Sequence, residues 1–300
     1  MPEERLVSAI ILTLNEELHL ERCIRSIESF CKDVFVVDSG STDATREIAE
    51  SLGAVVLENE WINYAKQFNW AIDNAPIDTQ WVMRIDADEY ATPELAQEIQ
   101  QRLPGLGEEV TGVNLRRRVH FMGRWIRYGS YYPTILLRIW RNGRGRCEDK
   151  WMDEHIQLDG GSALIFEHDF VDDNLHDLTW WTEKHNGYAT REAVDLLNLK
   201  YGMLDDAPAL LGGQAGGKRW IKENVYARIP RGIRAGLYTA YRYFLRLGFL
   251  DGTQGFFFHF LQGFWYRFLV DAKVWDIERR ARERGVDVKT VLIEDYGIRL

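Results

Sequence analysis

The chain has few cysteines: Cys23, Cys31 and Cys147 are the only three in 300 residues, and none has the Cys-x-x-Cys spacing. An odd number without that spacing argues against a disulfide framework or a zinc cage and fits a reducing compartment. The sequence also lacks an uncharged apolar run of about 20 residues, so we expect no membrane-spanning helix. Because the formal net charge is −9, we expect no nucleic-acid partner.

Two glycine motifs that mark other nucleotide-binding folds are missing as well. No Gly-x-Gly-x-x-Gly follows the first apolar run, and no Gly-Lys-Ser/Thr loop occurs. Their absence argues against a dinucleotide-binding fold and against a phosphate-loop ATPase. Aromatic residues, in contrast, make up 13% of the chain and include 11 tryptophans.

Apolar runs alternate with helical patterns along the first third of the chain. The runs expected as strands are 6–14, 34–38, 54–57 and 81–86, and the helical patterns between them are 15–27, 44–52 and 63–74. This alternation predicts an α/β fold with a doubly wound, mostly parallel sheet. After an expected helix at 93–103, residues 113–116 and 135–140 alternate like antiparallel strands, which predicts an antiparallel extension of the sheet.

The run that ends at Ile85 is followed at once by Asp86-Ala87-Asp88. Two carboxylates one residue apart repel each other unless a cation lies between them, and a hard divalent ion is the natural occupant. A solvated loop ahead of a helix start at Thr92-Pro93 is the structural alternative. Ligands of parallel α/β sheets bind at the carboxyl ends of strands, where this acidic pair is expected.

Four segments together resemble the family 2 glycosyltransferases, which have the GT-A fold. They are Thr13-Leu14-Asn15-Glu16, Val36-Val37-Asp38-Ser39-Gly40-Ser41-Thr42-Asp43, Asn63-Tyr64-Ala65-Lys66-Gln67-Phe68-Asn69-Trp70-Ala71 and Ile85-Asp86-Ala87-Asp88-Glu89. Within the family the chain looks most similar to bacterial transferases of lipopolysaccharide-core and surface-polysaccharide assembly.

The resemblance implies a nucleotide sugar, UDP-linked, as the sugar donor. Asp38 would accept a hydrogen bond from the uracil ring, and Asp86 would lie near the ribose. On the helix expected at 63–74, Lys66 and Asn69 share a face and would reach the base and the diphosphate. The full set of nucleotide-binding residues that the resemblance implies is Thr13, Asn15, Glu16, Asp38, Ser41, Lys66, Asn69 and Asp86.

The resemblance also implies a divalent metal, Mn²⁺ or Mg²⁺. Asp88 would be its direct ligand, with Asp86 beside it. His168, which follows an apolar run at 163–166, would be a third ligand as in some relatives. A core or hydrogen-bonding role is the alternative for this histidine.

Inverting transfer needs a carboxylate that takes the proton of the attacking hydroxyl. The family supplies this base from an acidic pair beyond the metal motif, and Asp153-Glu154 is the pair here. Asp153 fits an acidic-pair alignment and is slightly favoured, while Glu154 fits relatives with His-Glu at this place. Alternatively, one of the two forms an ion pair with Arg144 or Arg146.

The C-terminal part is basic and aromatic. Residues 228–282 contain ten lysines and arginines against four acids, and the aromatic run 256–268 is too apolar for a solvated helix. This composition predicts amphipathic helices that contact an anionic membrane surface. The alternative is a helix pair whose arginines form ordinary surface ion pairs. A glycine-rich segment at 210–218 is predicted to be a flexible joint, and 173–201 is predicted to be a helix.

We therefore expect three parts: 1–110 as the nucleotide-sugar half of a GT-A domain, 111–225 as the acceptor and catalytic half, and 226–300 as membrane-associated helices. The leading hypothesis is an inverting, metal-dependent glycosyltransferase with a lipid-linked glycan acceptor. It would act in the cytoplasm at the inner membrane of a bacterium. A metal-dependent nucleotidyltransferase and a catalytically inactive, membrane-tethered scaffold are the alternatives.

Overall fold

The computed structural model describes residues 5–148, 154–203 and 232–298. Asp153 and the glycine-rich segment 210–218 lie outside these ranges, so the predictions made for them stay predictions. The chain divides into two compact units, Met1–His176 and Asp177–Leu300. The predicted boundary at 110/111 falls within one strand of the first unit, and the three-part division remains a prediction.

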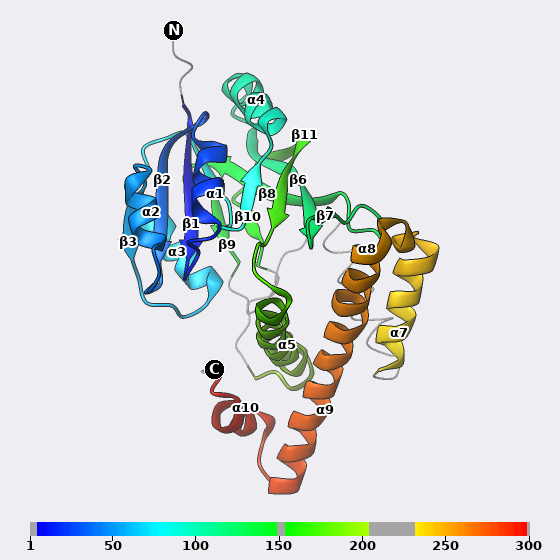
Figure 1. Cartoon of the computed structure of the whole chain (residues 1–300). Coiled ribbons are helices and arrows are strands. Elements are labelled where there is room, and N and C mark those ends of the chain that lie inside the picture. The colour runs from blue at the N-terminus through cyan, green and yellow to red at the C-terminus, as the bar shows by residue number, and fades with distance from the viewer. Residues whose placement is uncertain (1–4, 149–153, 204–231, 299–300) are drawn as a thin grey trace. The chain divides into compact units, whose positions relative to one another are not determined.

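The first unit is an α/β domain (Figure 1). Its elements, in chain order, are β1 (Val7–Thr13), α1 (Leu20–Ile27), β2 (Cys31–Asp38), α2 (Thr45–Ser51), β3 (Val55–Glu58), α3 (Tyr64–Asn74), β4 (Trp81–Arg84), β5 (Glu89–Ala91), α4 (Pro93–Arg102), the 3-10 turn η1 (Leu103–Gly105), β6 (Val110–Phe121), β7 (Arg124–Trp125), β8 (Thr134–Arg141), β9 (Gly145–Cys147), β10 (Ile156–Leu158) and β11 (Ser162–Asp173).

One sheet connects nine of the described strands in the order β3-β2-β1-β4-β8-β6-β11-β5, with β7 paired to β6. Strands β1 to β4 are parallel, as the strand–helix alternation predicts. β8 runs antiparallel to β4 and β6, and it joins the parallel half to the later strands. The predicted mostly parallel sheet with an antiparallel extension is confirmed.

Helices cover both faces of the parallel half. Because side chains alternate along a strand, Ile11 lies in the hydrophobic cluster with α1, α2 and α4, while Ile10 lies in the cluster with α3. Both side chains are fully buried. A strand buried on two faces needs the continuous apolar sequence seen in β1.

The second half of the unit departs from the sequence prediction at one place. A helix was expected from residue 173, but β11 extends to Asp173 and α5 begins at Leu178. β11 pairs with β6 on one side and β5 on the other, and this pairing outweighs the local helical pattern. Asp177 then caps the helix by accepting a hydrogen bond from the Trp180 N–H at 2.9 Å.

The second unit is helical among the described residues. Its elements are α5 (Leu178–Tyr201), α7 (Ile233–Ala240), the π-helical turn η3 (Tyr241–Leu245), the 3-10 turn η4 (Gly248–Asp251), α8 (Gly252–Phe258), the π-helical turn η5 (His259–Trp265), α9 (Tyr266–Arg284) and α10 (Val288–Tyr296). Apolar residues of α5, α9 and α10 form its main buried cluster. None of the helices described has the length and apolarity needed to cross a bilayer.

The chain reverses direction between α7 and α8 in a turn built on glycine. A Cβ at residue 248 would lie 2.5 Å from Nε2 of His259, so only glycine fits against this buried ring. Elsewhere in the unit, Arg234 of α7 forms a buried ion pair with Asp271 of α9, and Arg267 of α9 pairs with Glu192 of α5 at 2.9 Å. Two of the arginines expected to contact a membrane are therefore neutralised inside the unit.

The close approach at residue 248 gives a stability prediction. Gly248→Ala is expected to lower the free energy of unfolding by about 1–3 kcal/mol, because the added methyl group overlaps the His259 ring. Gly187→Ala is the matched control: this α5 residue has open space around it, and alanine there adds up to about 1 kcal/mol of stability. Denaturant titration followed by tryptophan fluorescence measures both, and equal stabilities for the two variants would contradict the packing described.

Candidate active site

The ends of β1 and β2 are joined by the carboxylate of Asp38. Its Oδ1 accepts hydrogen bonds from the Thr13 hydroxyl at 3.1 Å and the Ser41 hydroxyl at 2.5 Å. Its Oδ2 accepts from the backbone N–H groups of Gly40 and Ser41 at 2.9 and 2.8 Å. Four donors fill the acceptor positions of a carboxylate. Asp38 is only 1% exposed, and it shapes the loop after β2.

The loop after β1 is tied to the same place. Asn15 has a positive φ of 57°; its N–H donates to the Ser41 hydroxyl at 2.8 Å, and its side-chain oxygen accepts from the Thr42 N–H at 2.8 Å. Glu16 binds Nδ1 of His19 at 2.6 Å. The structure therefore brings together four of the predicted nucleotide-binding residues: Thr13, Asn15, Asp38 and Ser41.

Helix α3 carries two more of the predicted nucleotide-binding residues, Lys66 and Asn69, and their contacts differ. Lys66 is exposed and has no side-chain partner among the residues that the structure describes. Both atoms of the Asn69 amide bond the backbone of Cys147 at 2.9 Å, which fastens α3 to β9. Gln67, which the sequence did not single out, bonds the Ser39 hydroxyl at 3.1 Å. Lys66 is thus available to a ligand, whereas Asn69 holds a strand.

The acidic pair lies in a turn between β4 and β5, closed by a hydrogen bond from the Glu89 N–H to the Asp86 carbonyl at 2.9 Å. Both carboxylate oxygens of Asp86 have partners. Oδ1 accepts from the Tyr64 hydroxyl at 2.6 Å and lies 3.5 Å from Nε of Arg84. Oδ2 lies 3.5 Å from Nη2 of Arg138. Burial alone would raise the pKa of Asp86, but Arg84, Arg138 and Tyr64 together hold it well below its usual range.

Glu89 is the second acid of this cluster. Its Oε1 accepts from Nη2 of Arg138 at 2.5 Å, and its Oε2 accepts from the Asp86 N–H at 2.9 Å. Burial raises the pKa of Glu89 to about 8, because its side chain is only 2% exposed; Arg138 opposes the shift and Asp86 adds to it. Two neighbouring carboxylates with pKa values pushed apart indicate different protonation states at neutral pH.

Asp88 lies in the same turn as Asp86, but its contacts differ from those of Asp86. Its Oδ2 accepts from the side-chain amide of Asn174 at 3.0 Å. Its carbonyl oxygen accepts from the Asp173 N–H at 3.1 Å and from Arg22 at 3.3 Å. The turn is therefore held through backbone contacts from β11 and α1. The Asp88 carboxylate thus bonds a neutral amide, and two arginines lie against Asp86.

Arg84 connects the acidic turn to the segment expected to carry the base. Besides its contact with Asp86, Arg84 donates from Nη1 to the carbonyl oxygen of Glu154 at 3.2 Å and lies 4.1 Å from the centre of the Tyr64 ring. Arg146, one of the alternative ion-pair partners, binds Asp73 instead. The structure thus places the Glu154 backbone beside the acidic turn.

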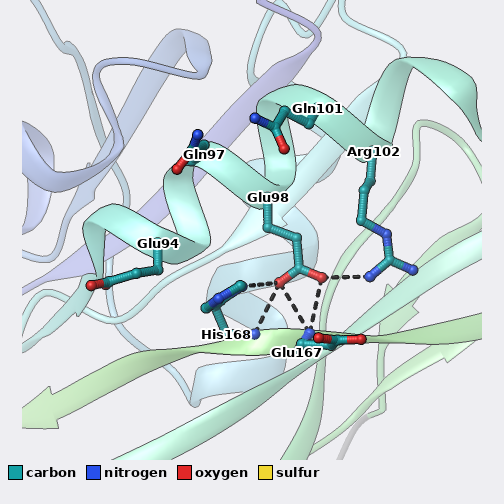
Figure 2. A pocket seen from close by; sticks show the side chains of 7 residues that line it. All are labelled: Glu94, Gln97, Glu98, Gln101, Arg102, Glu167 and His168. Atoms are coloured by element: carbon teal, nitrogen blue, oxygen red, sulfur yellow. Dashed lines mark hydrogen bonds and ion pairs between the residues drawn. The ribbon is translucent and has the colours of Figure 1, made fainter.

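His168 lies elsewhere on β11 and contacts α4 (Figure 2). Its Nδ1 lies 2.9 Å from Oε2 of Glu98. The same carboxylate accepts from the backbone N–H groups of Glu167 and His168, where β11 shifts register against β6. Glu167 and His168 line a pocket together with five residues of α4: Glu94, Gln97, Glu98, Gln101 and Arg102. The structure does not bring His168 together with Asp86 and Asp88.

The residues present fit a metal that takes few ligands from the protein. Among the described residues, no group of three histidine, cysteine or acidic side chains could hold an ion. Mg²⁺ at phosphate-transfer sites is bound by one or two carboxylates and takes its remaining ligands from phosphates and water. Asp88, half-buried in the turn, has the chemistry for such a site.

Several residues of the cluster were not found from the sequence: Tyr64, Arg84, Glu89, Arg138 and Asn174. Tyr64, Arg84 and Glu89 stand inside or next to the motifs, and a buried arginine at a strand end is the signal that could have drawn attention to Arg84. Arg138 and Asn174 reach the turn from β8 and from beyond β11, so only the pairing of the strands brings them there.

The raised pKa of Glu89 gives a pH prediction. In the unfolded chain this carboxyl has its ordinary pKa of about 4.5, whereas burial raises the pKa to about 8 in the folded protein. The folded state therefore binds more protons in this window, and the stability of the protein relative to Glu89→Gln falls as the pH rises from 5 to 8, by up to about 1.4 kcal/mol per pH unit. Urea titrations at several pH values measure the difference. A constant difference would mean that Glu89 is ionised throughout.

Relatives match the chain over different lengths. An uncharacterized glycosyltransferase of Rickettsia bellii is 45% identical over 94 residues, which is 31% of either chain. The chain thus spans about a third of that relative, and a Rickettsia felis relative is similar. The lipopolysaccharide core biosynthesis glycosyltransferase LpsC of Rhizobium meliloti is 29% identical and covers 94% of this chain and 96% of its own length.

Among solved structures, glucosyl-3-phosphoglycerate synthase from Mycobacterium tuberculosis is 25% identical, with a TM-score of 0.32 over 39% of this chain and 44% of that one. An overlap of this size carries no argument about function. The family model described as glycosyl transferase family 2 matches residues 8–173, which include the loops of β1 and β2, α3, the acidic turn and β11. The chain belongs to glycosyl transferase family 2.

Proposed function

We propose that this glycosyltransferase is an inverting enzyme that uses a UDP-linked sugar and a divalent metal. One observation carries the proposal: Arg84 contacts both the Asp86 carboxylate and the Glu154 carbonyl. The acidic turn expected to hold the leaving diphosphate and the segment expected to hold the base therefore converge on one side chain. This convergence is what transfer in a single displacement requires.

Asp88 would be the metal ligand, and Asp86 would not. Both oxygens of Asp86 are already engaged by Tyr64, Arg84 and Arg138, and Asp88 is the other carboxylate of the turn, half-buried beside it. Mn²⁺ or Mg²⁺ bound there would neutralise charge on the departing diphosphate. Lys66, exposed on α3, would contact the same diphosphate, and the Asp38 loop would bound the uridine pocket.

The proton of the acceptor hydroxyl would pass to Asp153 or Glu154 as its oxygen attacks the anomeric carbon. The bond from that carbon to the diphosphate oxygen breaks on the opposite side, so the configuration inverts and UDP leaves. Asp153 keeps the slight preference given by the resemblance, and Glu154 has the support of its neighbourhood with Arg84. A general base has to lie within hydrogen-bond reach of the hydroxyl in the bound state.

We further propose a lipid-linked glycan as acceptor, supported by the likeness to LpsC over nearly the whole chain. The second unit supports a membrane location. Large apolar side chains are exposed around the turn between α7 and α8, the most exposed being Leu245 at 74% and Phe244 at 63%. Their neighbours Leu247, Phe249, Leu250, Phe256 and Phe257 are at least 44% exposed. An apolar patch of this kind suits insertion at the surface of a bilayer.

The metal assignment predicts the behaviour of one variant. Asp88→Ala is expected to lower release of UDP from a UDP-sugar at least about a hundredfold, because charge on the leaving diphosphate is no longer neutralised. Asp159→Ala is the control, since that exposed aspartate has no side-chain partner among the described residues. The assay uses a panel of nucleotide sugars with Mn²⁺, Mg²⁺ or chelator. Normal turnover by Asp88→Ala would rule out this metal site.

The exposed turn predicts membrane binding. The double variant Phe244→Ser, Leu245→Ser is expected to weaken binding to vesicles of phosphatidylethanolamine and phosphatidylglycerol at least about tenfold, because two inserted apolar side chains are lost. Ile62→Ser, at an equally exposed apolar position of the first unit, is the control. Sedimentation with vesicles measures both. Equal binding by all variants, or binding abolished by about 1 M salt, would contradict insertion of this turn.

A further inference from the structure

Strand β6 carries three consecutive arginines, Arg116, Arg117 and Arg118. Because side chains alternate, Arg116, Arg118 and His120 share one face of the strand, and Arg117 lies on the other. Arg117 is paired there with Asp172 at 3.4 Å. On the opposite face, Arg116 and Arg118 are not both balanced by an acid.

Arg118 is held in a fixed orientation by part of its guanidinium only. Its Nε donates to Asp169 at 2.5 Å, and its Cζ lies 4.6 Å from the centre of the Trp125 ring. Asp169 is itself fixed, since its two oxygens accept from the Tyr132 hydroxyl at 3.0 and 3.2 Å. The two Nη atoms of Arg118 have no hydrogen-bond acceptor among the described residues, and its side chain is 35% exposed.

Arg116 adds a second cation, which, unlike Arg118, has no counter-charge among the described residues. In the part of the chain that the structure describes, its side chain forms neither a hydrogen bond nor an ion pair. The stacked ring of Trp125 orients a further arginine, since Cζ of Arg127 lies 5.1 Å from its centre. On a protein with a net charge of −9, the unused donors of Arg116 and Arg118 are suited to an anionic ligand.

This face adjoins the end of the sheet that carries the acidic turn. His120 is paired in register with Asp173 of β11 and with Trp125 of β7. The Asp173 N–H in turn donates to the Asp88 carbonyl at 3.1 Å. β6 thus leads from the acidic turn to the arginines, and a ligand bound on them lies next to the place proposed for the sugar donor.

We propose that Arg116 and Arg118 bind a negatively charged group, a phosphate or a carboxylate, of the acceptor glycan. The proposal deepens the function proposed above and rests on it. A guanidinium held by Nε offers its two Nη donors in the planar fork that matches either anion. The arginines would then select acidic acceptor sugars, while the acidic turn and Asp153-Glu154 perform the transfer.

The test measures binding of mannose 6-phosphate and glucuronate, with mannose and glucose as neutral counterparts, by calorimetry in the presence of saturating UDP and Mn²⁺. The bound UDP keeps the probes out of the diphosphate site. We expect at least one acidic sugar to bind about tenfold or more tightly than its neutral counterpart, and Arg116→Ala to remove that advantage. The phosphate and the carboxylate probes distinguish the two kinds of acidic acceptor.

Two further variants keep the result interpretable. Arg118→Lys keeps the charge but loses the fork, so binding is expected to weaken about tenfold. Arg144→Ala removes an exposed arginine near β9 that has no side-chain partner among the described residues, and it is expected to bind like the wild type. Equal affinity for acidic and neutral sugars, or equal losses in Arg116→Ala and Arg144→Ala, would overturn the proposal. UDP binding by the wild type is measured separately. Its failure would contradict the proposed function and not the proposal for the arginines.

Discussion

The Asp86 carboxylate lies between the two arginines Arg84 and Arg138, and the rest of the site depends on that arrangement. The two cations come from β4 and β8 and are largely buried. Without Asp86 they would lie as like charges in a low-dielectric environment, with only Glu89, bonded to Arg138, to offset them, at a cost of several kcal/mol. Their attraction to Asp86 fixes the end of β4 against β8 and brings the Tyr64 hydroxyl from α3 to the same carboxylate.

The three acids of this turn, Asp86, Asp88 and Glu89, have different surroundings. Asp86 keeps its charge because two arginines face it, and Glu89 is driven toward its protonated form by burial. Asp88 is placed by backbone contacts, and its carboxylate accepts a hydrogen bond from the side-chain amide of Asn174. The two aspartates of the motif therefore have different surroundings, with two arginines against Asp86 and the Asn174 amide against Asp88. Asp38 is a parallel case, because its four hydrogen bonds shape a loop and leave little for a ligand.

Much of this could be predicted from the sequence, since local patterns determine it. Continuous apolar runs predicted β1 and β2, and the alternation of strands and helices predicted the sheet and which strand ends would meet. What the sequence did not reveal depends on contacts between distant segments. Arg138 reaches Glu89 only because β8 inserts beside β4, and Asn69 is bonded to Cys147 only because β9 returns to α3. His168 follows an apolar run as expected, but a shift in register directs it toward Glu98.

The central proposal is that Asp88, and not Asp86, is the metal ligand. The most direct measurement is anomalous diffraction from crystals grown with UDP and Mn²⁺, which locates the ion without reference to activity. The account predicts one ion at about 2.1 Å from an oxygen of Asp88, with the UDP phosphates as further ligands and Asp86 still bonded to Tyr64 and Arg138. An ion coordinated by Asp86, with the two arginines displaced from it, would contradict the account.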